Sequence, residues 1–335
     1  MPQSRRPAGS TIGIVATLIA GLFWSARVSA ADPLPAWNEG ASKRSITNFV
    51  KRVTDPTSTG FVPPRERIAV FDNDGTLWCE QPLYVQLAFA LDRMQIMAPQ
   101  HPEWREQEPY KAALARDVEA ILSKGDYLMK VMMASHAEMT TVEFDRAVKE
   151  WMATARNPQT GRPYTDMVYQ PMIELLAYLR AHEFQTWIVS GGGVDFIRPW
   201  AKQVYGIPPE RVVGSTVKLR FELREKRPTL VRTSEFDFIN NAAGKPIAIQ
   251  KHIGRRPLAV FGNSDGDLQM LQWTAAGSGP RLAMIVHHTD GVREPAYDRK
   301  SNIGRLDKAL DAALRNGWTV VDIKREWRTL HPLVP

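Results

Sequence analysis

Four short apolar runs constrain the fold of this 335-residue chain more than any other feature. They are IAVF at 68–71, TWIVS at 186–190, LAVFG at 258–262 and LAMIVHH at 282–288. None of them shows the clean alternation of apolar and polar residues that a strand with one solvated face would have. Continuous apolar strands are typical of a parallel sheet that is covered on both faces. We therefore expect these runs to be buried strands of one sheet.

Helical patterns separate the runs. The segment 171–183 begins with Pro171 and leads into the second run, and the segment 268–277 follows the third. Closer to the end of the chain, a helical pattern stops at Gly317 and a last strand follows. Strands that alternate with helices predict an α/β domain with a doubly wound, parallel, Rossmann-like sheet.

Residues 80–170, between the first and second strands, carry helical patterns and no convincing strand. The patterns are clearest over 110–136 and 140–155, and the second opens with the candidate N-caps Thr140 and Thr141, with Glu143 nearby. We interpret this region as a helical cap inserted over the carboxyl edge of the sheet. Its methionines either line an adaptable pocket or belong to the core; they are Met129, Met132, Met133 and Met152.

A second excursion, over 212–241, contains two β-rich segments that predict a small β-hairpin flap. We interpret its basic residues mainly as solvated charges; they are Lys218, Arg220, Arg224, Lys226 and Arg227.

The first thirty residues have the pattern of a secretory signal peptide. Arg5 and Arg6 precede an uncharged stretch over 11–24, and Val28 and Ala30 fit the small-residue pattern before a cleavage site after Ala30. A retained membrane anchor is the alternative, although the run is shorter than the ~20 residues of a spanning helix. We expect a periplasmic or secreted protein that has no stable membrane insertion after signal cleavage.

The chain thus divides into three predicted parts. A signal peptide occupies residues 1–30, the α/β core is formed by residues 31–79 and 171–335, and the helical cap covers residues 80–170.

Charge and cysteine content bear on partners and stability. The formal net charge of +7 includes Arg5, Arg6 and Arg27, so removing these three leaves +4. This mild excess is compatible with small anionic substrates, and it lacks the concentrated basic stripe that nucleic-acid binding usually requires, so we predict no nucleic-acid partner. Cys79 is the only cysteine, so no disulfide can form within the chain, and we interpret it as a small buried hydrophobe.

Chemically reactive residues gather where the predicted strands end. The first strand is followed by Asp72 and Asp74, the second ends in Ser190 and three glycines, and the third leads into GNSDGD at 262–267. Lys245 stands at a predicted helix start before the third strand. Ligands of open α/β sheets bind at the carboxyl ends of the strands, so we expect these side chains to meet in one site.

Two simpler explanations of the acidic loops are Asx turns and calcium binding. A calcium loop needs Gly at its sixth position and Glu at its twelfth. The sixth residue is Leu77 when counted from Asp72 and Leu268 when counted from Asn263, so neither loop has this pattern.

With these motifs in this order, the sequence resembles the haloacid dehalogenase (HAD) superfamily, and within it the phosphatases of the phosphoserine phosphatase type. The resemblance extends from residue 67 to about residue 286 and includes the position of the cap. It implies that Asp72 is a nucleophile and Asp74 an acid–base residue. It also implies that Ser190, the amide of Gly191 and Lys245 bind the phosphoryl group.

The resemblance further implies a Mg²⁺ site that involves Asp72, Asp74, Asn263 and Asp267. Magnesium would reduce the repulsion between an anionic phosphate ester and a carboxylate nucleophile, and oxygen ligands suit this ion. Asn263 departs from the family pattern, which usually has a metal-binding Asp there, and Asp265 is an alternative source of the missing charge.

Several assignments stay open. Lys251 and Lys226 are alternatives to Lys245. Glu80 and Gln81 lie near the position of a substrate-binding Glu in phosphoserine phosphatases, but Glu80 is out of register by one and Gln81 is a different residue. This weakens the case for phosphoserine as the substrate.

The histidine pair His287 and His288 lies at the end of the fourth run, and we interpret both as ordinary strand-end residues rather than metal ligands.

The resulting expectation is an exported, Mg²⁺-dependent phosphatase that acts on a small phosphorylated metabolite through an aspartyl-phosphate. Dehalogenation, phosphonate cleavage and phosphoryl transfer are alternative reactions on the same scaffold. A protein that binds phosphate esters without turnover is the alternative outside enzymes. Asp74 favours the phosphatase over a dehalogenase, because dehalogenases of this superfamily typically lack that second acid.

Overall fold

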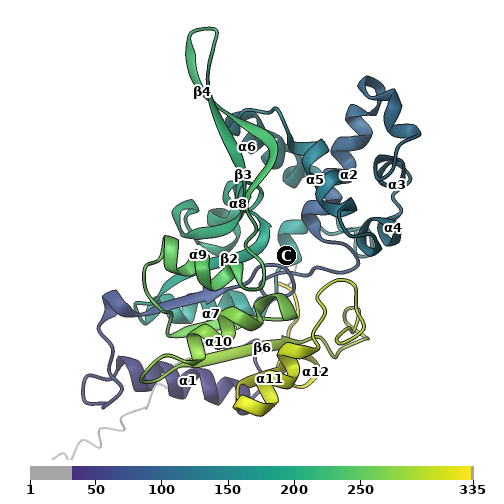
Figure 1. Cartoon of the computed structure of the whole chain (residues 1–335). Helices are drawn as coiled ribbons and strands as arrows, with labels where there is room; N and C mark the ends of the chain where they lie inside the picture. Colours follow the sequence, from purple (N-terminus) through teal and green to yellow (C-terminus); the bar gives the residue numbers. More distant parts are fainter. Residues whose placement is uncertain (1–31, 333–335) are drawn as a thin grey trace, which may run out of the picture. The chain divides into compact units, whose positions relative to one another are not determined.

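The computed structural model describes residues 32–332 and contains a seven-stranded sheet (Figure 1). The strand order is β4-β3-β2-β1-β5-β6-β7, and all neighbouring pairs are parallel except β3 and β4. The predicted α/β class with a mostly parallel sheet is confirmed. The strands are β1 (Ile68–Phe71), β2 (Gln185–Gly193), β3 (Val212–Arg224), β4 (Arg227–Phe238), β5 (Ala259–Gly262), β6 (Leu282–His287) and β7 (Thr319–Asp322).

The central strands are apolar on both sides because a hydrophobic core lies on each face of the sheet. In β1, Ala69 and Phe71 belong to the core on one face, and Ile68 and Val70 belong to the core on the other. Phe71 stacks on Phe261 of the neighbouring strand, with ring centroids 4.3 Å apart. Complete burial of a large apolar side chain of this kind stabilises a fold by roughly 1.5–3 kcal/mol.

Helices cover both faces of this sheet. Residues of α1 (Ala41–Thr54), α7 (Gln170–Ala181), α8 (Val194–Tyr205) and α12 (Ile323–Glu326) contribute to one core. Residues of α9 (Gly244–His252), α10 (Leu268–Ala275) and α11 (Lys308–Asn316) contribute to the other. The predicted helices at 171–183 and 268–277 and the stop at Gly317, which has φ of +66°, agree with this arrangement. Helices α1 and α8 were not predicted.

Between β1 and α7 lie the helices α2 (Val85–Met97), α3 (Tyr110–Leu114), α4 (Val118–Ser123), α5 (Tyr127–His136) and α6 (Thr141–Thr154). The first four share a hydrophobic cluster of their own. Helix α6 joins the core of the sheet domain through Phe144, Val148 and Met152, and α2 contributes Phe89 to the same core. These helices all lie inside the predicted cap region, while the exact domain boundaries stay a prediction.

The segment 110–136 forms three short helices. A residue with positive φ, Arg116 (φ 55°), separates α3 from α4, and Asp117 then caps α4 by accepting a hydrogen bond from the amide of Ala120. By contrast, α6 begins as predicted: the hydroxyl of Thr140 accepts from the Glu143 amide at 3.0 Å, and the Glu143 carboxylate accepts from the Thr140 amide at 2.8 Å.

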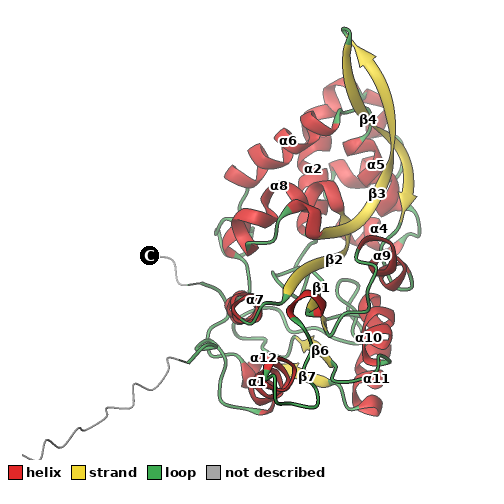
Figure 2. Cartoon of the chain, turned by 90° about the vertical axis from the view of Figure 1, so that its left-hand side faces the viewer, coloured by secondary structure: helices red, strands yellow, loops and turns green. Residues whose placement is uncertain are grey.

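The predicted hairpin flap is the antiparallel pair β3–β4, which extends beyond the other strands toward the cap helices (Figure 2). Backbone hydrogen bonds join the hairpin to the short link between α5 and α6. The Glu138 amide donates to the carbonyl of Arg232 at 2.8 Å, and the Arg232 amide donates to the carbonyl of Met139 at 2.9 Å. The hairpin therefore connects the sheet to the cap.

The predicted signal peptide, residues 1–30, lies outside the described residues. Within residues 32–332, no helix combines the length and the apolar character needed to cross a bilayer. Cys79 is buried and unpaired, in agreement with its interpretation as a small core residue.

Candidate active site

The loop after β1 brings two carboxylates to the carboxyl edge of the sheet. The amide of Asp72 still donates to the carbonyl of Phe261 at 2.9 Å, so Asp72 directly continues the strand. The chain then turns through Gly75, whose φ of +75° favours glycine. Asp74 accepts a hydrogen bond at Oδ1 from the Trp78 indole at 3.0 Å. Both carboxylates line the same cavity.

Lys245 reaches this loop from the first turn of α9. Its ammonium group donates to Oδ1 of Asp72 at 2.6 Å and to Oδ1 of Asp267 at 2.5 Å. All three side chains are buried. The two alternative lysines lie elsewhere: Lys251 sits 4.7 Å from the centroid of the Phe238 ring, and Lys226 is exposed in the hairpin turn.

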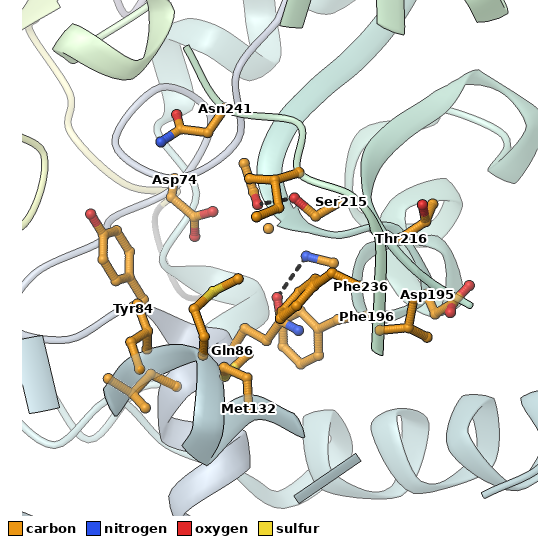
Figure 3. Close-up of a pocket in the computed structure, with 18 of the residues that line it drawn as sticks. Asp74, Tyr84, Gln86, Met132, Asp195, Phe196, Ser215, Thr216, Phe236 and Asn241 are labelled. Atoms are coloured by element: carbon orange, nitrogen blue, oxygen red, sulfur yellow. Dashed lines mark hydrogen bonds between the residues drawn. The ribbon is translucent and has the colours of Figure 1, made fainter. Parts of the chain in front are cut away.

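The glycine loop after Ser190 forms another wall of the cavity, which Gly191, Gly192 and Gly193 line. Strand β2 runs three residues further than predicted and shifts its register here. The Ser215 hydroxyl donates to the carbonyl of Gly191 at 2.8 Å, and the Gln86 side chain accepts from the Gly193 amide at 2.8 Å (Figure 3). Helix α8 begins at the next residue, so its N-terminus adjoins the loop.

Ser190 itself does not line the cavity. It is fully buried, and its hydroxyl accepts a hydrogen bond from the amide of Gly192 at 3.0 Å. In this structure, therefore, the loop glycines and not the serine side chain meet the cavity.

Most of the GNSDGD segment, residues 262–267, lies behind the cavity wall. One oxygen of Asp267 binds Lys245, and the other accepts from the amides of Asn263 and Ser264 at 2.9 and 3.0 Å. The Asn263 side chain accepts from the Thr76 hydroxyl at 3.1 Å. Neither Asn263 nor Asp267 lines the cavity, whereas Ser264 does.

Asp265, which the sequence suggested as an alternative source of negative charge for the metal site, binds backbone amides outside the cavity. Its carboxylate accepts hydrogen bonds from the amides of Asp307 and Ala309, at 3.0 and 2.8 Å, near the start of α11.

Glu80 lines the cavity together with Asp72 and Asp74, whereas the sequence indicates it only through its nearness to the position of a substrate-binding Glu. It is 2% exposed, and its Oε1 accepts from the Asn263 amide group at 2.7 Å and from the Tyr297 hydroxyl at 2.8 Å. Its Oε2 receives no hydrogen bond from a described residue. Tyr297 lies more than two hundred positions away in the chain, so no local pattern could have indicated this contact.

Burial and crowding of like charges make this end of the cavity electrostatically unfavourable for anions. Burial, together with the charge of Asp267, raises the pKa of Asp72 to about 7, despite the opposing effect of Lys245. Burial also raises the pKa of Asp74, and it raises that of Glu80 further, with contributions from the two aspartates. Burial alone would lower the pKa of Lys245, but the carboxylates of Asp267 and Asp72 raise it.

His288 contacts the loop that carries Asp72 and Asp74. Its ring hydrogen-bonds to Glu294 at 2.6 Å and to the carbonyl of Gly75 at 2.8 Å. His287 lies 3.5 Å from Asp298, away from the cavity. Neither histidine lines the cavity, and their interpretation as ordinary strand-end residues stays a prediction.

The cavity has a volume of about 300 Å³ and lies between the sheet edge, the cap and the hairpin (Figure 3). Of the methionines that could line a pocket or fill the core, Met129, Met132 and Met133 line the cavity, and Met152 belongs to the core.

The donor atoms suit a hard divalent cation by type and by charge. Four carboxylates line the cavity. Asp195 is paired with Arg232, which leaves Asp72, Asp74 and Glu80 near the sheet edge, and the one lysine in the lining also neutralises Asp267. Within residues 32–332, no three His, Cys, Asp or Glu side chains form a ready-made metal-binding group. Magnesium usually keeps several waters and needs only one or two carboxylates, so this donor set fits that ion.

Comparison with known proteins gives one family. The family model for haloacid dehalogenase-like hydrolases matches residues 69–272. A search of curated proteins found no match.

Among solved structures, a conserved protein of unknown function from Anaerococcus prevotii is similar, with 18% identity and a TM-score of 0.49 over 74% of this chain and 86% of that one. A phosphoserine phosphohydrolase-like protein from Francisella tularensis has 16% identity and a TM-score of 0.42 over 78% of this chain and 95% of that one.

Proposed function

The chain belongs to the haloacid dehalogenase-like hydrolases, and on this premise we propose that it is a Mg²⁺-dependent phosphatase that hydrolyses a small phosphate monoester. One observation carries the proposal: Asp72, Asp74 and Lys245 converge from two distant segments on one cavity at the carboxyl edge of the sheet. The cap helices lie between the loop that carries Asp72 and the loop that follows Ser190, and this position agrees with the phosphoserine phosphatase-like branch.

The first half-reaction transfers the phosphoryl group to the protein. An oxygen of Asp72 attacks phosphorus and forms a P–O bond while the bond from phosphorus to the ester oxygen breaks. Asp74 donates its proton to that departing oxygen, which leaves as an alcohol. The raised pKa of Asp74 supports this role, because a carboxyl group must hold a proton to act as an acid.

The second half-reaction regenerates the protein. Asp74, now ionised, takes a proton from water as that water attacks phosphorus, and the bond to Asp72 breaks. Inorganic phosphate leaves, and both carboxyl groups return to their initial states. The same group thus acts first as acid and then as base.

Charge on the transferring group is stabilised by Lys245 and by the glycine loop. The amide of Gly191 and the adjoining N-terminus of α8 provide positive ends of dipoles for the phosphoryl oxygens. Ser190 was expected to donate to the same oxygens, and its buried hydroxyl would have to turn to do so.

We assign the magnesium ligands to Asp72 and the backbone carbonyl of Asp74, with Glu80 as an additional carboxylate. Asn263, which was also expected among the ligands, holds Thr76 and Glu80 and would have to turn toward the cavity to join them. Bound Mg²⁺ would offset the repulsion between these carboxylates and the phosphate and keep Asp72 ionised at neutral pH. Asp267 was expected among the ligands, but one of its oxygens binds Lys245 and the other accepts from the amides of Asn263 and Ser264. Its role is to orient those two elements.

The test is phosphate release by the purified protein from a panel of small phosphate monoesters, with Mg²⁺ and with excess EDTA. We expect turnover that depends on the metal and that Asp72→Asn abolishes, while the circular dichroism spectrum is retained. Activity of Asp72→Asn equal to wild type would exclude the aspartyl-phosphate. Binding of esters without turnover would favour the non-catalytic alternative.

Export remains part of the proposal and is supported by the pattern of residues 1–30. N-terminal sequencing of the protein recovered from a bacterial host tests it, with a mature N-terminus at Ala31 as the expected result. Retention of Met1, or recovery only with membranes, would contradict cleavage.

A further inference from the structure

The cavity continues beyond the acidic residues into an apolar chamber. We define this chamber by six side chains from the cap, α8 and β4: Leu87, Met129, Met132, Met133, Phe196 and Phe236. Figure 3 shows Met132, Phe196 and Phe236 around the same space that Asp74 borders. A phosphoryl group bound at Asp72 would therefore direct the alcohol part of its ester into an apolar environment.

The charged residues of the chamber wall neutralise each other. The guanidinium of Arg232 forms an ion pair with Asp195 and lies 4.1 Å from the centroid of the Phe144 ring. Arg232 is 4% exposed. Because its charge is already matched, it offers little attraction to an anionic leaving group.

His136 adds no charge at neutral pH. Its ring is buried and hydrogen-bonds to the Ser135 hydroxyl at 2.8 Å. Burial, with the nearby positive charge of Arg232, lowers its pKa to about 3. Nε2 of His136 and Nε of Arg232 lack hydrogen-bond partners among the described residues, and each atom has almost no solvent-accessible surface.

A leaving group that enters this chamber loses its water. Against the six apolar side chains, an ammonium, a carboxylate or several hydroxyl groups would lose hydrogen bonds to water, which disfavours their entry. The polar side chains that also line the cavity include Gln86, Thr216 and Asn241. A hydrocarbon group gains by the same transfer, and the unbranched methionine side chains can adapt to its shape.

We propose that the substrate is a phosphate monoester whose alcohol part is uncharged and largely apolar, such as an aryl or alkyl group. The inference rests on the proposed function, and it goes further by assigning selectivity to the chamber. It predicts discrimination against phosphoserine and sugar phosphates.

Binding of non-hydrolysable alkylphosphonates tests the chamber independently of catalysis. Calorimetry on the full-length mature protein with Mg²⁺ would compare methyl- to pentylphosphonate, and propylphosphonate with 2-aminoethylphosphonate, which is similar in size but carries an ammonium group. We expect Kd to fall about fourfold per methylene until the chamber is filled. We expect 2-aminoethylphosphonate to bind at least about tenfold more weakly than propylphosphonate.

Two variants localise the effect. Met132→Gln places a polar side chain of similar length in the chamber and should weaken pentylphosphonate about tenfold while changing methylphosphonate less than about twofold. Met97→Gln is the matched control, since Met97 lies on cap helix α2 but does not line the cavity. Met132→Leu should behave like wild type.

Turnover of the matching alkyl phosphates, phosphoserine and glucose 6-phosphate completes the experiment. Affinity that is independent of chain length, or tighter binding of 2-aminoethylphosphonate, would overturn the chamber assignment. Affinity that rises with chain length and falls in Met132→Gln supports it. If that pattern appears but no ester is hydrolysed, the chamber stands and the proposed phosphatase function fails.

Discussion

Asp72 is expected to lower the stability of the metal-free protein, so that Asp72→Asn should raise it. The side chain is 6% exposed and lies beside the carboxylates of Asp267 and Asp74. Its pKa is about 7 in the folded protein, against 3.8 for an ordinary aspartate. This difference of about three pH units, at 1.36 kcal/mol per unit, corresponds to about 4 kcal/mol in the free energy of unfolding.

The sign of the stability change follows from the pH at which Asp72 ionises in the folded and in the unfolded protein. Below pH 3.8 Asp72 is protonated in both states, and the Asn variant gains nothing. Between pH 3.8 and about 7 the unfolded chain ionises while the folded protein does not, so wild type progressively loses stability. Above pH 7 the difference is constant. The expected advantage of Asp72→Asn therefore grows from near zero at pH 4 to on the order of 4 kcal/mol at pH 8.

The assay is urea denaturation followed by tryptophan fluorescence, with EDTA, between pH 4 and pH 8. Asp290→Asn is a matched control because Asp290 is also buried but has the opposite behaviour. Burial by itself would raise the pKa of Asp290, yet hydrogen bonds from Arg293 and the Val292 amide lower it. Asp290→Asn should therefore destabilise at neutral pH, and this cost should disappear as the pH falls. An Asp72→Asn variant that is no more stable than wild type at pH 8, or equally stabilised at pH 4, would refute the reasoning.

Three further outcomes are expected. Gly75→Ala should strongly reduce Mg²⁺ affinity and turnover, because a Cβ there would lie 2.0 Å from the Asn263 side-chain nitrogen on a backbone with positive φ; an unchanged calorimetric Mg²⁺ titration would contradict this. Thr140→Ala removes the cap that binds the Glu143 amide and should lower the free energy of unfolding by about 1 kcal/mol, measured in urea; no loss would exclude the capping contribution. Lys245→Met leaves two buried carboxylates without their counter-ion and should cost roughly 3–5 kcal/mol at pH 8, with a smaller cost at pH 5; a pH-independent loss would point to packing instead.

Patterns local to the chain account for the fold. Residues 68–71 and 259–262 are apolar throughout because each strand is buried on both faces, and this is visible in the sequence. Thr140 and Glu143 are three positions apart, so the start of α6 was also readable. The break near Arg116 was missed, because helical composition continues through it.

The residues of the candidate site were likewise predicted in part from local patterns. The sequence predicted that Asp72, Asp74, Ser190, Gly191 and Lys245 would meet, since each lies at a strand end or at the start of a helix beside one. All of them except Ser190 line the cavity. The sequence favoured Lys245 over Lys251 and Lys226 by its spacing, and only the folded chain shows that Lys245 is the lysine that reaches Asp72.

The surroundings of those residues depended on tertiary structure. Glu80 becomes part of the site because Asn263 and Tyr297 hold its carboxylate, and both contacts join segments that are far apart in the chain. The apolar chamber likewise arises where the cap, α8 and the hairpin approach each other. A sequence records which side chains are available at a strand end, but the neighbours that set their charge and select their ligand are chosen by long-range packing.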